Sequence, residues 1–272
     1  CLIFVVALKD SLSTKKGLVL GLSIATLLLS DNTLAIILMI ANIIVISKVK
    51  KDDVRHEKKE IPTLDRVDTS DKSVLGGILC LVIYFSQMFL PVSASKTTSY
   101  IISILFYIIV LVVCILMFKD NLKRDIKLLK ENFKAYISFL LPKLGIMYLS
   151  YIITSVICVY VLNQGVSVNQ QAVESLPLYV SFPLAVFWAP IVEEILFRGC
   201  LRRLIKNDKI FIVMSGLIFG LLHTMYEPTL FGVVTMMIPY GLLGGFFAYF
   251  YVKTNNITTN MMCHCFHNTV VM

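Results

Sequence analysis

Long apolar runs separated by short polar segments dominate the pattern of this chain. They lie near residues 1–8, 17–29, 34–47, 74–92, 99–118, 136–162, 178–200, 210–224, 230–252 and 257–272. About 20 apolar residues cross a bilayer as a helix, so the longer runs predict membrane spans. The polar residues 30–33 predict a tight turn between two short helices. The fold class predicted is all-α, a polytopic transmembrane helix bundle that encloses an intramembrane active-site cavity.

Composition agrees with this class and excludes others. The 272 residues are 57% hydrophobic and 15% charged, whereas soluble domains carry about 25% charged residues. The net charge of +8 would suggest nucleic acid as the partner of a soluble protein. Here the basic residues lie between apolar runs, which predicts a lipid bilayer as partner and no nucleic acid. The seven cysteines lie mostly in apolar runs without a C-x-x-C pair, so they are interpreted as small buried hydrophobes.

Basic residues predict the orientation of the helices. Loop 48–73 holds eight Lys and Arg, segment 119–134 holds six and segment 198–209 holds five, whereas the alternate loops hold only Lys96. The positive-inside rule therefore places the basic loops in the cytoplasm and predicts a multi-pass protein of the cell membrane. Segment 119–134 leaves two readings open, an amphipathic helix on an anionic leaflet and a solvated loop.

The charged loop predicts a division of the chain into three parts. Residues 1–73 are expected to hold N-terminal spans and a charged cytoplasmic linker, residues 74–162 the middle helices with the basic amphipathic loop, and residues 163–272 a catalytic core. The short apolar run that ends at Leu8 is interpreted as the tail of a truncated first span. Truncation is also expected at Met272.

Two adjacent carboxylates and an arginine lie inside the apolar run that contains Ala189–Gly199. Ionised groups in a membrane span cost roughly 2.5–3.5 kcal/mol each, so they are candidates for function. On a helix Glu194 and Arg198 are four residues apart and can pair. Glu193 points about 100° away, which leaves one acid available for general-base chemistry.

Three of the four histidines also lie in apolar runs. His223 and Glu193 are nearly equidistant from a predicted turn at 207–208, so on antiparallel helices they are expected to lie level with each other. His264 and Asn268 share a helical face, although His264 lies shallower by residue count. For a single histidine of this kind, a structural hydrogen bond between helices is an equally good explanation.

The chemistry that fits these residues is peptide hydrolysis in a water-holding cavity. Glu193 would take a proton from water, with His223 positioning that water or a metal that activates it. His264 and Asn268 are donors suited to a developing oxyanion. The pair of Glu194 and Arg198 would brace the site. Pro183 and Pro190 would bend the carrier helix and free backbone carbonyl groups.

The segments EEILFRG, FGLLH and HCFHN resemble the motifs EExxxR, FxxxH and HxxxN/D of the CPBP intramembrane proteases, also called the CAAX protease and bacteriocin-processing (Abi) family. The resemblance covers about residues 163–272 and is closest to the bacterial branch. It implies a membrane endopeptidase with Glu193, Glu194, His223, His264 and Asn268 at the catalytic site and with Arg198 and Phe219 supporting them. It leaves the cofactor open, since Glu193, His223 and His264 could bind one Zn²⁺ or act without metal.

Three functions follow from these observations. The first is an endopeptidase of the bacterial cytoplasmic membrane that cleaves a membrane-associated protein or peptide, either a CAAX-type tail or a bacteriocin or pheromone precursor. The second is a non-proteolytic adaptor or bacteriocin self-immunity protein that binds a peptide or a sensor. The third, a transporter, is disfavoured because no paired inverted halves are seen. An unpaired acid favours the enzyme.

Overall fold

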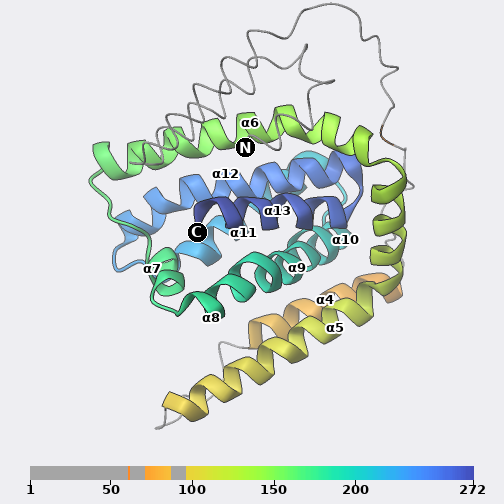
Figure 1. The fold of residues 1–272 in the computed structure, drawn as a ribbon, viewed down its shortest axis with the longest axis horizontal. Coiled ribbons are helices and arrows are strands. Elements are labelled where there is room, and N and C mark those ends of the chain that lie inside the picture. Colours follow the sequence, from red (N-terminus) through yellow and green to blue (C-terminus); the bar gives the residue numbers. More distant parts are fainter. Residues whose placement is uncertain (1–60, 62–70, 87–95) are drawn as a thin grey trace, which may run out of the picture. The chain divides into compact units, whose positions relative to one another are not determined.

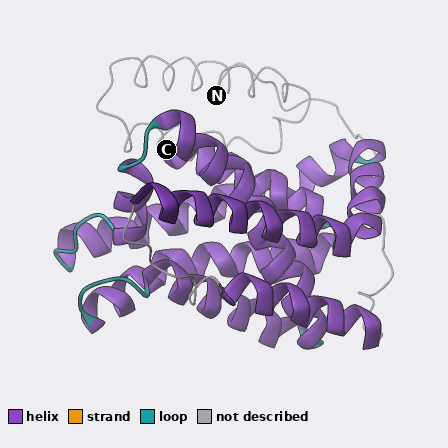
Figure 2. Cartoon of the chain, turned by 90° about the horizontal axis from the view of Figure 1, so that it is seen from below, coloured by secondary structure: helices purple, strands orange, loops and turns teal. Residues whose placement is uncertain are grey.

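The computed structural model describes residue 61, residues 71–86 and residues 96–272. These residues form helices joined by short loops, with no strand among them (Figure 2). Four helices are long and apolar enough to cross a membrane, namely Ile101–Glu131, Phe133–Val161, Leu178–Leu204 and Leu230–Thr254. The predicted all-α, polytopic fold is therefore confirmed. The spans predicted within residues 1–47, the turn at 30–33 and most of the charged linker lie outside the described residues, and the end of the linker belongs to a helix that begins at Asp71.

The described chain forms two compact units, and Figure 1 shows their helices. The first contains α6 (Phe133–Val156), which continues as the π-helical turn η3 (Ile157–Val161). The second contains the described residues between 71 and 132 and all of residues 164–272. Its elements are α4 (Asp71–Phe85), α5 (Lys96–Glu131), α7 (Val168–Glu174), α8 (Leu178–Phe182), η4 (Pro183–Trp188), α9 (Ala189–Glu194), η5 (Ile195–Cys200), α10 (Leu201–Leu204), α11 (Asp208–Thr224), α12 (Leu230–Thr254) and α13 (Ile257–Val271). The predicted three-part division of the chain stays a prediction.

The segment from α8 to α10 is one helical rod interrupted by two π-helical turns. In the π-helical turns η4 and η5 the backbone hydrogen bonds join residues five apart, whereas those of an α-helix join residues four apart. Such turns are frequent at functional sites. Pro183 opens η4 and Pro190 lies at the start of α9. Because proline lacks an N–H and its ring crowds the preceding turn, it favours such departures from the α-helical ladder.

Glycines allow α11 and α12 to pack backbone against backbone. A Cβ atom at Gly216 would lie 2.7 Å from the carbonyl oxygen of Gly241, and one at Gly244 would lie 2.6 Å from Cβ of Phe219. Neither position can hold a larger residue without moving the helices apart, because real Cβ contacts are not this short. This close packing brings the α11 face that carries Phe219 against α12.

The basic segment after residue 118 continues α5 as a helix with one buried face. Asp125 is 1% exposed, and its Oδ2 accepts a hydrogen bond from the backbone N–H of Ile257 at 2.7 Å. Its carbonyl oxygen accepts another from Nδ2 of Asn256 at 2.9 Å. The solvated-loop reading of this segment is therefore wrong. Since Asn256 is also fully buried, the turn before α13 is recessed into the protein, which explains how His264 reaches the depth of Glu193 despite its residue count.

Candidate active site

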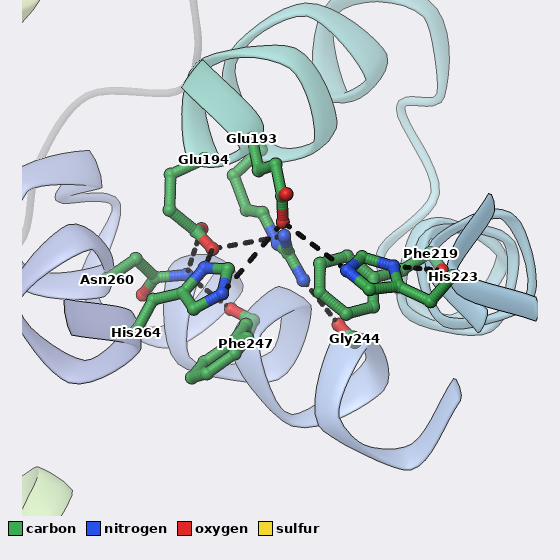
Figure 3. A network of polar contacts seen from close by, with 9 residues as sticks. Glu193, Glu194, Phe219, His223, Gly244, Phe247, Asn260 and His264 are labelled. Carbon is green, nitrogen blue, oxygen red and sulfur yellow. Dashed lines mark hydrogen bonds and ion pairs between the residues drawn. The ribbon is translucent and has the colours of Figure 1, made fainter. Parts of the chain in front are cut away.

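Glu193 lies between two histidines that come from different helices (Figure 3). Its Oε2 is 3.9 Å from Nε2 of His223 on α11 and 3.9 Å from Nε2 of His264 on α13. This oxygen is buried and has no hydrogen-bond partner among the described residues. A buried carboxylate oxygen without a donor is costly. The position is therefore suited to a group that binds there, such as water or a substrate.

Glu194, its neighbour in sequence, is held on both of its oxygens. Oε1 accepts hydrogen bonds from Nη1 of Arg198 at 3.1 Å and from Nδ1 of His264 at 2.9 Å. Oε2 accepts one from Nδ2 of Asn260 at 3.2 Å. Glu194 and Arg198 are both fully buried, so the charges compensate each other away from water. The predicted pairing of Glu194 with Arg198 is present.

Arg198 also ties two helices together. Its Nη2 donates to the carbonyl oxygen of Gly244 on α12 at 2.8 Å. The guanidinium lies 5.2 Å from the ring centroid of Phe219 and 5.4 Å from that of Phe247. These are distances at which aromatic rings attract a cation. The planar guanidinium thus donates hydrogen bonds to a carboxylate and a carbonyl group while it contacts two aromatic rings. An ammonium group cannot make all of these contacts at once.

Hydrogen bonds fix the orientation of both imidazole rings. Nδ1 of His223 lies 2.8 Å from the carbonyl oxygen of Phe219, and Nδ1 of His264 lies 2.9 Å from Glu194. A carbonyl and a carboxylate accept hydrogen bonds, so we assign a proton to Nδ1 of each ring. Nε2 of both rings then faces Glu193.

Asn268 is bound to a carbonyl group that the π-helical turn leaves without its own donor. In η4 the N–H of Ala189 bonds to the carbonyl of Leu184, five residues earlier. The next donor in this register belongs to position 190, where proline has no N–H. The carbonyl of Ala185 instead accepts from Nδ2 of Asn268 at 2.7 Å. Because an amide NH₂ carries two hydrogens, the second one stays available.

The structure adds Asn260 and Phe247 to the residues expected from sequence. Nδ2 of Asn260 donates to Glu194 and, at 2.5 Å, to the carbonyl of Phe247. The Phe247 ring stacks on His264 with centroids 4.7 Å apart. A sequence signal for Asn260 exists, because it precedes His264 by four residues just as Asn268 follows it by four, so all three share one face of α13. No comparable signal marks Phe247 among the many aromatic residues of α12.

The predicted metal ligands do not have the geometry of a metal site. Two ligands on a tetrahedral zinc ion with bonds of about 2.0–2.1 Å lie about 3.4 Å apart, whereas Glu193 lies 3.9 Å from each histidine nitrogen. No group of three His, Cys, Asp or Glu side chains in the described part of the chain is arranged to hold a metal ion.

Fold and site together define a multi-pass helical membrane protein with a buried carboxylate–histidine centre. The family model of the type II CAAX prenyl endopeptidase Rce1-like proteins matches residues 175–270, the segment that contains all three motifs. The resemblance predicted from these motifs is thereby confirmed.

Two curated relatives are bacterial. An uncharacterized protein of Mycoplasma capricolum subsp. capricolum is 30% identical over 166 residues, which cover 56% of this chain and 48% of the relative. The UPF0177 protein YaiH of Lactococcus lactis subsp. lactis is 28% identical over 103 residues, covering 38% of this chain and 39% of the relative. The chain thus spans less than half the length of each of these relatives. No solved structure matches it significantly.

Proposed function

We propose that this protein is an endopeptidase of a bacterial cytoplasmic membrane that hydrolyses a peptide bond in a membrane-associated protein or peptide. The observation that carries the proposal is the free, buried Oε2 of Glu193, placed 3.9 Å from the Nε2 atoms of both His223 and His264. A protein that used these residues only for packing would gain nothing from an acid without a donor.

In the proposed reaction a water molecule binds beside Glu193. His223 accepts a hydrogen bond from this water at Nε2 and orients it, while Glu193 takes the other proton as the water oxygen attacks the peptide carbonyl. The negative charge that develops on the carbonyl oxygen is stabilised by doubly protonated His264 and by the second N–H of Asn268. The C–N bond then breaks, and the proton on Glu193 passes to the leaving amine.

Glu194 acts in this scheme through His264. Its carboxylate orients the imidazole of His264 through the Nδ1 contact, so that Nε2 faces the reacting group. Arg198 and Asn260 hold Glu194 in place. Two neighbouring acids therefore have different roles, because one is fully bonded and the other is free.

Replacement of the free acid tests the proposal. Proteoliposomes containing the wild type or Glu193→Gln would be incubated with a library of membrane-anchored peptides that includes prenylated CAAX tails and bacteriocin-like precursors. New peptide termini would be counted by mass spectrometry. We expect cleavage by the wild type and a loss of at least about 100-fold in Glu193→Gln, since an amide cannot accept the proton.

Matched variants define the outcome. Glu174→Gln makes the same change at an exposed acid of α7 and should leave cleavage unchanged, and Asn268→Ala should cause an intermediate loss. If Glu193→Gln cleaves as well as the wild type, or if the wild type generates no new termini, the protease proposal fails and the binding role of an adaptor or immunity protein takes its place. Incubation with a chelator should leave the wild-type rate unchanged.

A further inference from the structure

Tyr240 of α12 lies against the imidazole of His223. The two ring centroids are 5.0 Å apart with an interplanar angle of 24°, and Phe219 stacks on the same imidazole at 4.2 Å and 24°. Two rings that both lie nearly parallel to one imidazole at these distances cannot occupy the same face. The imidazole of His223 is therefore held between Phe219 and Tyr240.

The hydroxyl of Tyr240 is anchored in turn by the segment that begins α7. It lies 2.7 Å from Oγ of Ser167, the residue that caps the N-terminus of α7 by accepting from the N–H of Gln170. The N–H of Val168 donates to Oε1 of Glu227 at 2.8 Å. Two hydrogen bonds thus join the start of this short helix to α12 and to the loop after α11.

His223 needs such support more than His264 does. It is the last residue but one of α11, which ends at Thr224, and its side chain is 17% exposed against 4% for His264. Its Nδ1 bond leads back to the carbonyl of its own helix, whereas His264 is bound to the buried Glu194. A ring at a helix end with one local hydrogen bond can rotate unless its faces are confined.

We propose that Tyr240 is a positioning residue whose ring keeps Nε2 of His223 directed at Glu193, with the hydrogen bond to Ser167 as a secondary restraint. The inference rests on the proposed function for its catalytic consequence, although the restraint on the ring is a property of the structure alone. Misplacement of a reacting group by about 1 Å costs roughly 100-fold in rate, so removal of the ring should lower kcat by roughly 10–100-fold while KM changes little.

The restraint can be measured without any substrate. Protein labelled with ¹³C at the histidine Cε1 atoms would be examined by NMR in nanodiscs, with the His223 signal assigned by its absence in His223→Gln. Two stacked rings shift this C–H signal upfield. Tyr240→Leu should move the signal downfield, whereas Tyr240→Phe and Ser167→Ala should both retain most of the shift because the aromatic ring of residue 240 stays in place in each.

The matched control is Tyr249→Leu, the same change on the same helix beside Lys253 and Phe250, which should leave the His223 signal in place. An unchanged His223 signal in Tyr240→Leu with an unchanged thermal midpoint would overturn the proposal.

The activity arm uses the peptide library described above. Tyr240→Leu should lose cleavage, Tyr240→Phe should restore it, and Tyr240→Leu should have no further effect when His223 is already Gln, because the two residues act as one unit. Equal losses from Tyr240→Leu with and without His223 would contradict positioning. If the wild type does not cleave, the proposed function fails, whereas the NMR result still decides whether Tyr240 restrains His223.

Discussion

Two rods of the same compact unit, the apolar part of α5 and the rod from Leu178 to Leu204, show how differently membrane helices are built. In their most apolar 18-residue windows the mean hydropathy is 3.3 for α5 and 1.6 for the other rod, and the buried share of residues is 17% and 44%. A helix that faces lipid must be apolar all round. One that is enclosed by protein can carry Glu193, Glu194 and Arg198, provided that neighbouring helices supply their partners.

The same contrast holds for the buried acids of the two rods. Asp125, in the basic part of α5, contacts Arg124, whose side chain is 40% exposed, and caps α13. Glu194 contacts Arg198, whose side chain is 0% exposed. The first pair can be hydrated when it is disturbed, whereas the second cannot. The comparison therefore predicts that thermal stability and cleavage depend strongly on the exact side chains of the enclosed rod and weakly on those of α5.

The largest effect is expected when the same conservative change is made in each arginine. Arg198→Lys keeps the charge but cannot bond Glu194 and the Gly244 carbonyl together, and a hydrogen bond to a charged group contributes about 1.5–3 kcal/mol. We expect a clear fall of the thermal midpoint in detergent together with a loss of cleavage. Arg124→Lys should behave like the wild type, because the Arg124 side chain is 40% exposed and water can replace its contact with the buried Asp125. Equal midpoints for the two variants would show that enclosure does not matter here.

Much of the candidate site follows from local rules of sequence. Glu194 and Arg198 are four residues apart, and so are His264 and Asn268, so one helical turn predicts which pairs share a face. The level placement of Glu193 and His223 follows from equal distances to one turn. The all-α fold follows from apolar runs of spanning length. These inferences succeed because they need only the geometry of a single helix or hairpin.

The remaining features depend on contacts between distant residues. The depth of His264 is set by Asp125, which is 132 residues before Ile257 in the chain and lies in a segment that resembles a solvated loop. The role of Asn268 at Ala185 depends on a π-helical turn, which Pro190 makes possible but does not specify. Tyr240 and Phe247 are recognised only from their packing, because aromatic residues are common in α12.

An intermediate effect is expected at Asn260, which joins α13 to the enclosed rod. Asn260→Ala removes the side-chain donor to the Phe247 carbonyl and to Oε2 of Glu194. A buried acceptor such as Oε2 that is left without a donor costs about 1–3 kcal/mol. The thermal midpoint and the cleavage rate should both fall, because Glu194 would no longer hold His264 firmly. Thr269→Ala, on the same helix at an exposed position, is the control. Wild-type cleavage by Asn260→Ala would show that Arg198 alone fixes Glu194.

The smallest effect is expected on the lipid-facing side of α5. Leu116 is 62% exposed, whereas Leu196, in the enclosed rod between Glu194 and Arg198, is 0% exposed. Truncation of a buried leucine to alanine costs about 2–5 kcal/mol through lost contacts and the cavity that remains. Leu116→Ala only exchanges side-chain atoms for lipid, which is as apolar as leucine, so its cost should stay within about 0.5 kcal/mol. Thermal midpoints in lipid nanodiscs would measure both. A loss for Leu116→Ala as large as that for Leu196→Ala would mean that this face of α5 is covered by protein in the membrane, and the difference between the two rods would then lie in chemistry alone and not in enclosure.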